Sequence, residues 1–96
     1  MGRALAVAIG VASIAAAVVA SAEPPAGAAA CSGCHPASTR VTSPVPRLAG
    51  LDRATIVRAM QDFRSGQRAS TVMDRIAKGF TDAEIQAIAA WYATQR

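Results

Sequence analysis

The pentapeptide Cys31-Ser32-Gly33-Cys34-His35 decides how this chain can fold. C-x-x-C-H is the attachment signature of a c-type haem. Two thiols three positions apart lie on one side of a helical turn, so both can add to the vinyl groups of one porphyrin, and the adjacent imidazole can reach the iron. The spacing therefore predicts one covalent haem, bound through Cys31 and Cys34, with His35 as an iron ligand.

Two other interpretations of the cysteine pair are weaker. A dithiol redox pair is expected beside a βαβ pattern, which the sequence lacks. A zinc site needs two further ligands, and nothing else in the chain supplies them.

The first 22 residues have the pattern of an export signal. Arg3 precedes an apolar run over residues 4–20, and Ala20-Ser21-Ala22 offers a small-x-small cleavage site before Glu23. We expect residues 1–22 to be a cleaved signal peptide and residues 23–96 to form one haem domain in the periplasm. An uncleaved membrane anchor is the alternative, because the apolar run approaches a spanning length.

The charge balance argues against nucleic acid as a partner. The chain has ten basic and six acidic residues. Loss of Arg3 with the signal peptide would leave an excess of three positive charges, of which two haem propionates would offset most. Export also removes the protein from nucleic acid. A domain this small often needs a supplement to its apolar core, and a covalent porphyrin is one.

Apolar periodicity predicts helices and no strands. A short helix is expected to start near Ala26 and to carry the haem motif on its last turns. Asp52 can cap a second helix, which Gly66 ends. Its buried face is expected to consist of Ile56, Ala59, Met60 and Phe63.

Two further helices are expected in the second half. A short turn covers residues 74–78, where Asp74 and Lys78 are spaced to pair. The segment from Thr81 to Glu84 is a capping box that starts the last helix. Its buried stripe is expected to be Ile85, Ile88, Ala89 and Tyr92, flanked by Trp91. The sequence predicts an all-α fold of three to four helices packed around one haem.

The second iron ligand must be sought outside histidine, because His35 is the only histidine. Methionine, lysine or an open position remain. Met73 follows a polar loop and can present its thioether to the far face of the ring, whereas Met60 is expected in the core and Lys78 in solvent. We therefore predict His35 and Met73 as metal ligands, a pair that suits an electron carrier.

Residues 36–50 form a loop rich in proline, serine and threonine. The carbonyl oxygen of Pro44 or of Pro46 could accept a hydrogen bond from His35 and so fix the orientation of its ring. Both prolines remain candidates.

These features together resemble a class I c-type cytochrome. The resemblance rests on the haem motif, on Pro46-Arg47-Leu48-Ala49-Gly50, on a methionine in the second half and on an aromatic residue in the terminal helix. It implies that Leu48 and Trp91 belong to the haem-binding set and that Trp91 packs against the N-terminal helix. The chain departs from the family in lacking a large apolar residue before Cys31.

A closer resemblance rests on residues 62–66 and on Ala69-Ser70-Thr71-Val72-Met73-Asp74-Arg75-Ile76-Ala77-Lys78-Gly79-Phe80. This run is similar to the haem subunit of flavocytochrome c sulfide dehydrogenase. The resemblance implies a heterodimer in which an FAD-containing flavoprotein oxidises sulfide. The haem subunit, not catalytic alone, would accept the electrons one at a time and pass them to a periplasmic or membrane acceptor.

Two other functions are open to a small haem protein. A free monohaem cytochrome that shuttles between redox enzymes needs the same chemistry but a different surface, with a charged rim around the exposed haem edge. A haem peroxidase would need an open iron and distal acid–base groups. The single histidine and the expected Met73 ligand disfavour a peroxidase.

Overall fold

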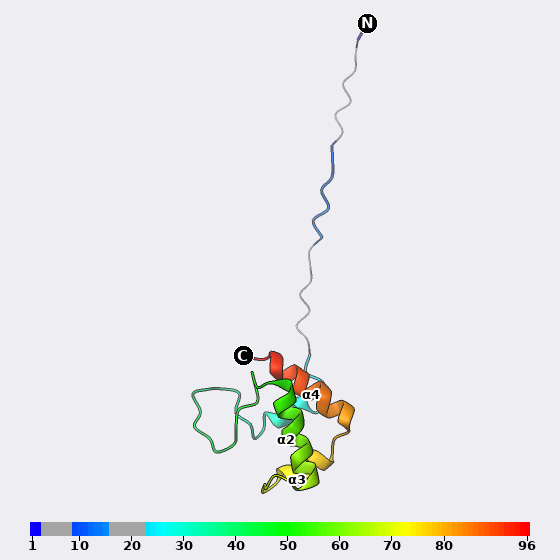
Figure 1. Ribbon diagram of the computed structural model, residues 1–96. Helices are drawn as coiled ribbons and strands as arrows, with labels where there is room; N and C mark the ends of the chain where they lie inside the picture. The colour runs from blue at the N-terminus through cyan, green and yellow to red at the C-terminus, as the bar shows by residue number, and fades with distance from the viewer. Residues whose placement is uncertain (3–8, 16–22) are drawn as a thin grey trace.

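The computed structural model describes residues 1–2, 9–15 and 23–96. The described part contains four helices and no strand: α1 (Ala28–Cys31), α2 (Arg53–Ser65), α3 (Met73–Lys78) and α4 (Asp82–Thr94). The all-α prediction is confirmed. Figure 1 shows α2 in front of α4, with α3 at the far end of α2. Much of the expected signal peptide, residues 1–22, lies outside the described residues. Among the described residues, no helix has both the length and the apolar character needed to cross a membrane.

Helix α2 begins and ends where its capping residues predict. The Asp52 carboxylate accepts a hydrogen bond from the Ala54 amide, and Gly66 ends the helix in the left-handed conformation at φ +80°. Ile56 is buried, and Met60 packs partly buried beside it against the core. The predicted apolar face is therefore the more buried side of this helix, with Ile56 buried and Ala59, Met60 and Phe63 half-buried.

Helix α4 begins at the predicted capping box. The Thr81 hydroxyl accepts from the Glu84 amide at 3.2 Å, and the Glu84 carboxylate accepts from the Thr81 amide at 2.9 Å. The second of these bonds is the main cause that lowers the pKa of Glu84. All four residues of the predicted apolar stripe are buried: Ile85, Ile88, Ala89 and Tyr92.

The core joins three helices around the start of the haem motif. The buried cluster comprises Ala28 from α1, Ile56 from α2, and Ile88, Ala89 and Tyr92 from α4. Several partly buried apolar side chains border this cluster: Cys31, Leu48, Val57, Met60, Phe80 and Trp91. Cys31, the first cysteine of the motif, therefore lies directly against the packed interior.

Helix α1 is shorter than predicted. It starts at Ala28, because Gly27 has a left-handed backbone at φ +86° that cannot continue a helix, and it ends at Cys31. The chain then continues in hydrogen-bonded turns through His35, whose amide donates to the Cys31 carbonyl at 2.9 Å. The helical turn expected at the motif is present, but most of it lies beyond α1.

The expected pairing of Asp74 with Lys78 does not form. Asp74 instead shares two hydrogen bonds with Ser70, which precedes α3. Within the described ranges, the ion pair joins Arg64 of α2 to Asp82 of α4 at 2.6 Å. Arg64 also donates to the Phe80 carbonyl at 2.8 Å, so it ties the turn before α4 to α2.

Candidate haem site

Cys31 is the last residue of α1 and Cys34 lies one turn beyond it, and no disulfide joins the two. Cys31 is half-buried and its thiol lies 3.6 Å from the Gly27 carbonyl oxygen, whereas Cys34 is exposed. Burial raises the pKa of the Cys31 thiol, and its hydrogen bonds oppose that rise. One turn of backbone joins the pair, since the Cys34 amide donates to the Cys31 carbonyl at 3.2 Å. Both sulfur atoms are thus presented from one turn, as attachment to one porphyrin requires.

The ring of His35 is held by a single carbonyl oxygen. Its Nδ1 lies 2.6 Å from the carbonyl oxygen of Pro46. A carbonyl only accepts, so Nδ1 carries the proton and Nε2 keeps its lone pair for a metal. Of the two candidate prolines, Pro46 makes this contact, while Pro44 lies exposed in the loop.

Tyr92 anchors the haem motif to α4, and the sequence did not assign it that role. Its hydroxyl donates to the Ala28 carbonyl at 2.6 Å, and it accepts from the Ser32 hydroxyl at 3.1 Å, because its single proton is already used. Its side chain is 6% exposed, and burial raises its pKa. The helical spacing of apolar residues in this segment predicts that Tyr92 lies in the core. Nothing in the sequence indicates which groups form hydrogen bonds with its hydroxyl.

Trp91 lies beside Tyr92 but is only half-buried. The two rings meet edge to face, with centroids 4.8 Å apart. Trp91 and Leu48 share the wall of a cavity of about 130 Å³ with His35. The structure therefore brings Trp91, Leu48 and His35 together, while the buried aromatic that bonds α1 is Tyr92.

We expect Tyr92→Phe to lower the free energy of unfolding by about 1–3 kcal/mol, because the buried Ala28 carbonyl loses its donor. Urea denaturation of the haem-loaded protein measures this. Ser32→Ala is the matched control, since it removes only the exposed end of the same network, and it should cost less than half as much. Equal losses in the two variants would contradict the assignment of the main contact to Ala28.

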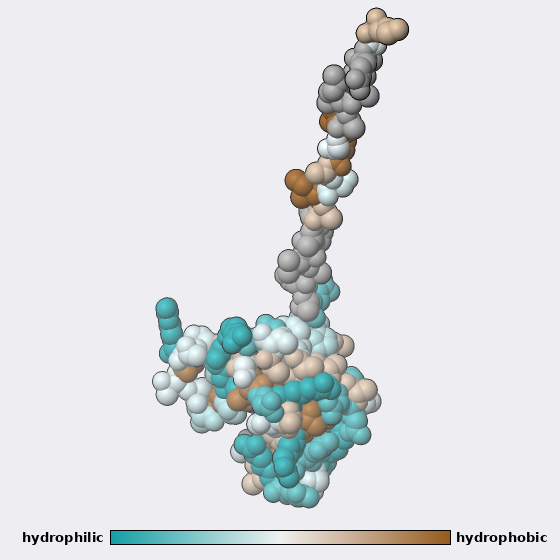
Figure 2. Space-filling model, turned by 45° about the horizontal axis from the view of Figure 1, so that its top comes forward, coloured by the Kyte–Doolittle hydropathy of each residue, from teal (hydrophilic) through white to brown (hydrophobic). Residues whose placement is uncertain are grey.

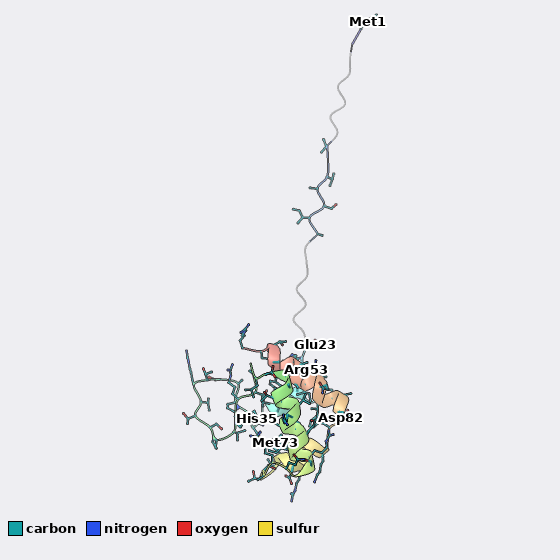
Figure 3. All side chains as sticks on the ribbon, viewed as in Figure 1. Met1, Glu23, His35, Arg53, Met73 and Asp82 are labelled. Carbon is teal, nitrogen blue, oxygen red and sulfur yellow. The ribbon has the colours of Figure 1, made fainter. Side chains whose placement is uncertain are left out.

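The two candidate methionine ligands, Met60 and Met73, lie in different surroundings. Met60 packs against the core cluster from α2. Met73 is the first residue of α3, half-buried, and does not belong to the set that borders that cluster. Figure 3 labels both His35 and Met73 in the lower part of the molecule, near α2. Of the two thioethers, only that of Met60 borders the buried cluster.

The residues present fit a covalent porphyrin. Half-buried apolar side chains border the core close to the motif, among them Leu48, Met60 and Trp91. They offer a porphyrin face an apolar surface, and His35 is oriented with Nε2 free to bind iron.

A larger open hollow, of about 600 Å³, lies along α2 and is lined mostly by polar and charged residues such as Arg53, Arg58 and Gln86. It contains no residue of the predicted site.

Known proteins similar to this chain are cytochromes. The chain is 42% identical over 62 residues to the cytochrome subunit of sulfide dehydrogenase from Chlorobaculum tepidum, which is 65% of this chain and 56% of that protein. It is 40% identical to a thiosulfate dehydrogenase electron acceptor from Stutzerimonas stutzeri, over 66% of this chain and 30% of the relative. It is 35% identical to cytochrome c-552 from Acidithiobacillus ferridurans, over 68% and 28%. No protein-family model matches the chain.

The chain belongs to the class I c-type cytochromes. The resemblance predicted from the sequence is thereby confirmed. As a c-type cytochrome, the protein binds haem c covalently, and Cys31 and Cys34 are the two cysteines with the required spacing. Haem iron supplies one-electron redox chemistry when bound. The cytochrome spans about half the length of the first of these relatives and about a third of the other two.

Proposed function

We propose that this cytochrome is an electron-transfer subunit that accepts electrons one at a time from an FAD-containing, sulfide-oxidising flavoprotein. The observation that carries the proposal is the 42% identity to the cytochrome subunit of sulfide dehydrogenase. The cytochrome alone is not the catalyst in this proposal. It holds the haem, and a downstream periplasmic or membrane acceptor takes the electron.

His35 and Met73 are the proposed axial ligands. The hydrogen bond from Nδ1 of His35 to Pro46 leaves Nε2 free, and Met60 is engaged in the core. A thioether favours reduced iron and so raises the potential, while two protein ligands together close the iron to substrates. Both effects suit a carrier better than an oxidase or a peroxidase.

Export to the periplasm completes the proposal. Residues 1–22 are the proposed signal peptide, cleaved before Glu23. The similar proteins are c-type cytochromes, which supports export. Electrons would then be passed on in the compartment where the partner and the acceptor reside.

A surface beside Met73 supports a lasting interface. Val72 is 49% exposed and Ile76 37% exposed, one helical turn apart. Arg75 and Lys78 are exposed on the same helix. An apolar centre with charged residues at its edge is the composition of a stable protein interface.

A free shuttle is the second candidate. The name of the Stutzerimonas stutzeri relative, a thiosulfate dehydrogenase electron acceptor, favours it, since an acceptor need not be a subunit. The two proposals share the haem site. They differ in whether a flavoprotein stays bound during purification.

Affinity purification of the cytochrome from its native host separates these candidates. We expect a flavin-containing chain to copurify in a one-to-one ratio, and Ile76→Glu to reduce its recovery about tenfold, because a charge would be buried in the apolar centre. Val41→Glu is the matched control, since Val41 is 56% exposed in the loop of residues 36–50. Recovery of the wild-type protein as a monomer would instead favour the shuttle.

A further inference from the structure

Residues 36–47 form a loop that is closed by two neighbouring contacts. Figure 1 shows this segment extending away from the helices between α1 and α2. At its base, Nδ1 of His35 lies 2.6 Å from the Pro46 carbonyl oxygen. One residue after Pro46, Nε of Arg47 donates to the Ala37 carbonyl at 2.8 Å. The two contacts join residues 35 and 37 to residues 46 and 47.

Beyond this base, the loop stabilises itself only locally. The Ser38 hydroxyl accepts from the Arg40 amide and the Ser43 hydroxyl accepts from the Val45 amide, each at 3.1 Å. In the part of the chain that the structure describes, residues 38–45 show no hydrogen bond to another element. The position of Pro46 and Arg47 relative to His35 therefore depends on the two contacts at the base of the loop.

We propose that Arg47 is a positioning residue for His35, acting through the Pro46 carbonyl. Arg47 follows Pro46 directly, and a charge-assisted bond to Ala37 fixes the peptide that bears the carbonyl oxygen. The hydrogen bond to Nδ1 sets both the orientation of a ligating imidazole and its strength as a donor to the metal. Arg47 thus controls the iron ligand without touching it.

The inference rests on the proposed role of His35 as an iron ligand, and it holds for a docked subunit and for a free shuttle alike. The positive charge of Arg47 is not what distinguishes it, because Arg40 in the same loop carries the same charge. Arg40 is exposed, and its backbone amide, not its guanidinium, takes part in the local turn. Arg40 is therefore a matched control.

Proton exchange at the His35 ring tests the proposal in the reduced, haem-loaded protein. The Nδ1 proton is observed by nuclear magnetic resonance while it exchanges with deuterated solvent. We expect the Nδ1 proton to exchange about tenfold faster in Arg47→Gln and in Arg47→Lys, because both variants lose the hydrogen bond to the Ala37 carbonyl. The exchange rate should be unchanged in Arg40→Gln. Arg47→Lys retains the charge but replaces the Nε donor with a methylene, so it decides the matter if Arg47→Gln does not retain haem.

The midpoint potential gives a second measurement. A weaker hydrogen bond to the ring makes the imidazole a poorer donor to oxidised iron, so the potential of Arg47→Lys should rise while its charge is unchanged. Wild-type exchange rates in both Arg47 variants would overturn the proposal and leave the electron-transfer role intact. A wild-type spectrum without histidine ligation would instead overturn the proposed ligand set.

Discussion

Met73→Ala is expected to abolish the long-wavelength absorption band of sulfur-ligated oxidised haem and to lower the midpoint potential. Thioether ligation favours the reduced iron, so its loss stabilises the oxidised form. Axial ligands shift haem potentials over a range of about 0.8 V, and we expect a decrease on the order of 0.1 V. Visible spectroscopy of the oxidised protein and a redox titration measure both effects.

Met60→Ala is the matched control for this experiment. It removes the other thioether that could be considered, from a side chain that packs on the core. We expect it to keep the absorption band and to lower the free energy of unfolding by about 2 kcal/mol, since it leaves a cavity. The reverse pattern, in which Met60→Ala loses the band and Met73→Ala keeps it, would assign the ligand to Met60.

The parts of the fold that were predicted correctly depend on neighbours in the chain. The capping box from Thr81 to Glu84 is formed within four residues, and so is recognisable without tertiary contacts. The same holds for Asp52 and Gly66 at the ends of α2. An apolar stripe with helical spacing also predicts which face is buried, and the stripe of α4 is buried throughout.

What the sequence could not decide depends on contacts between distant segments. Pro44 and Pro46 are equivalent in sequence, and only the path of the loop brings the carbonyl of Pro46 to His35. Trp91 and Tyr92 are adjacent aromatics, and the crossing of α1 and α4 determines that Tyr92 reaches the Ala28 carbonyl. The Arg64 to Asp82 ion pair likewise joins two helices, where local spacing had suggested Asp74 and Lys78.

The absence of a large apolar residue before Cys31 has a structural counterpart in Phe80. A Cβ atom placed on Gly27 would lie 2.6 Å from the Phe80 ring and 3.5 Å from Ile88. Phe80 is partly buried against the core, so an aromatic ring from the turn before α4 occupies the space beside α1. The two segments fit only because position 27 has no side chain.

Gly27→Ala should therefore be among the most destabilising single changes outside the haem ligands. The left-handed backbone at φ +86° costs an alanine about 1–2 kcal/mol, and displacing the Phe80 ring costs about 1–3 kcal/mol more. Together these reach about 2–5 kcal/mol, a large part of the stability of a small domain. Urea denaturation of the haem-loaded protein measures the loss.

Gly66→Ala separates the two contributions. Gly66 has nearly the same φ, +80°, but a Cβ there meets nothing within 4 Å. The loss of stability in this variant should therefore come from the left-handed backbone alone. In a Phe80→Ala background, Gly27→Ala should cost no more than Gly66→Ala, because the ring that it displaces is gone. If Gly27→Ala and Gly66→Ala were equally destabilising in the wild-type background, the Phe80 ring would be free to move. The Phe80 ring would then not limit which residue can occupy position 27.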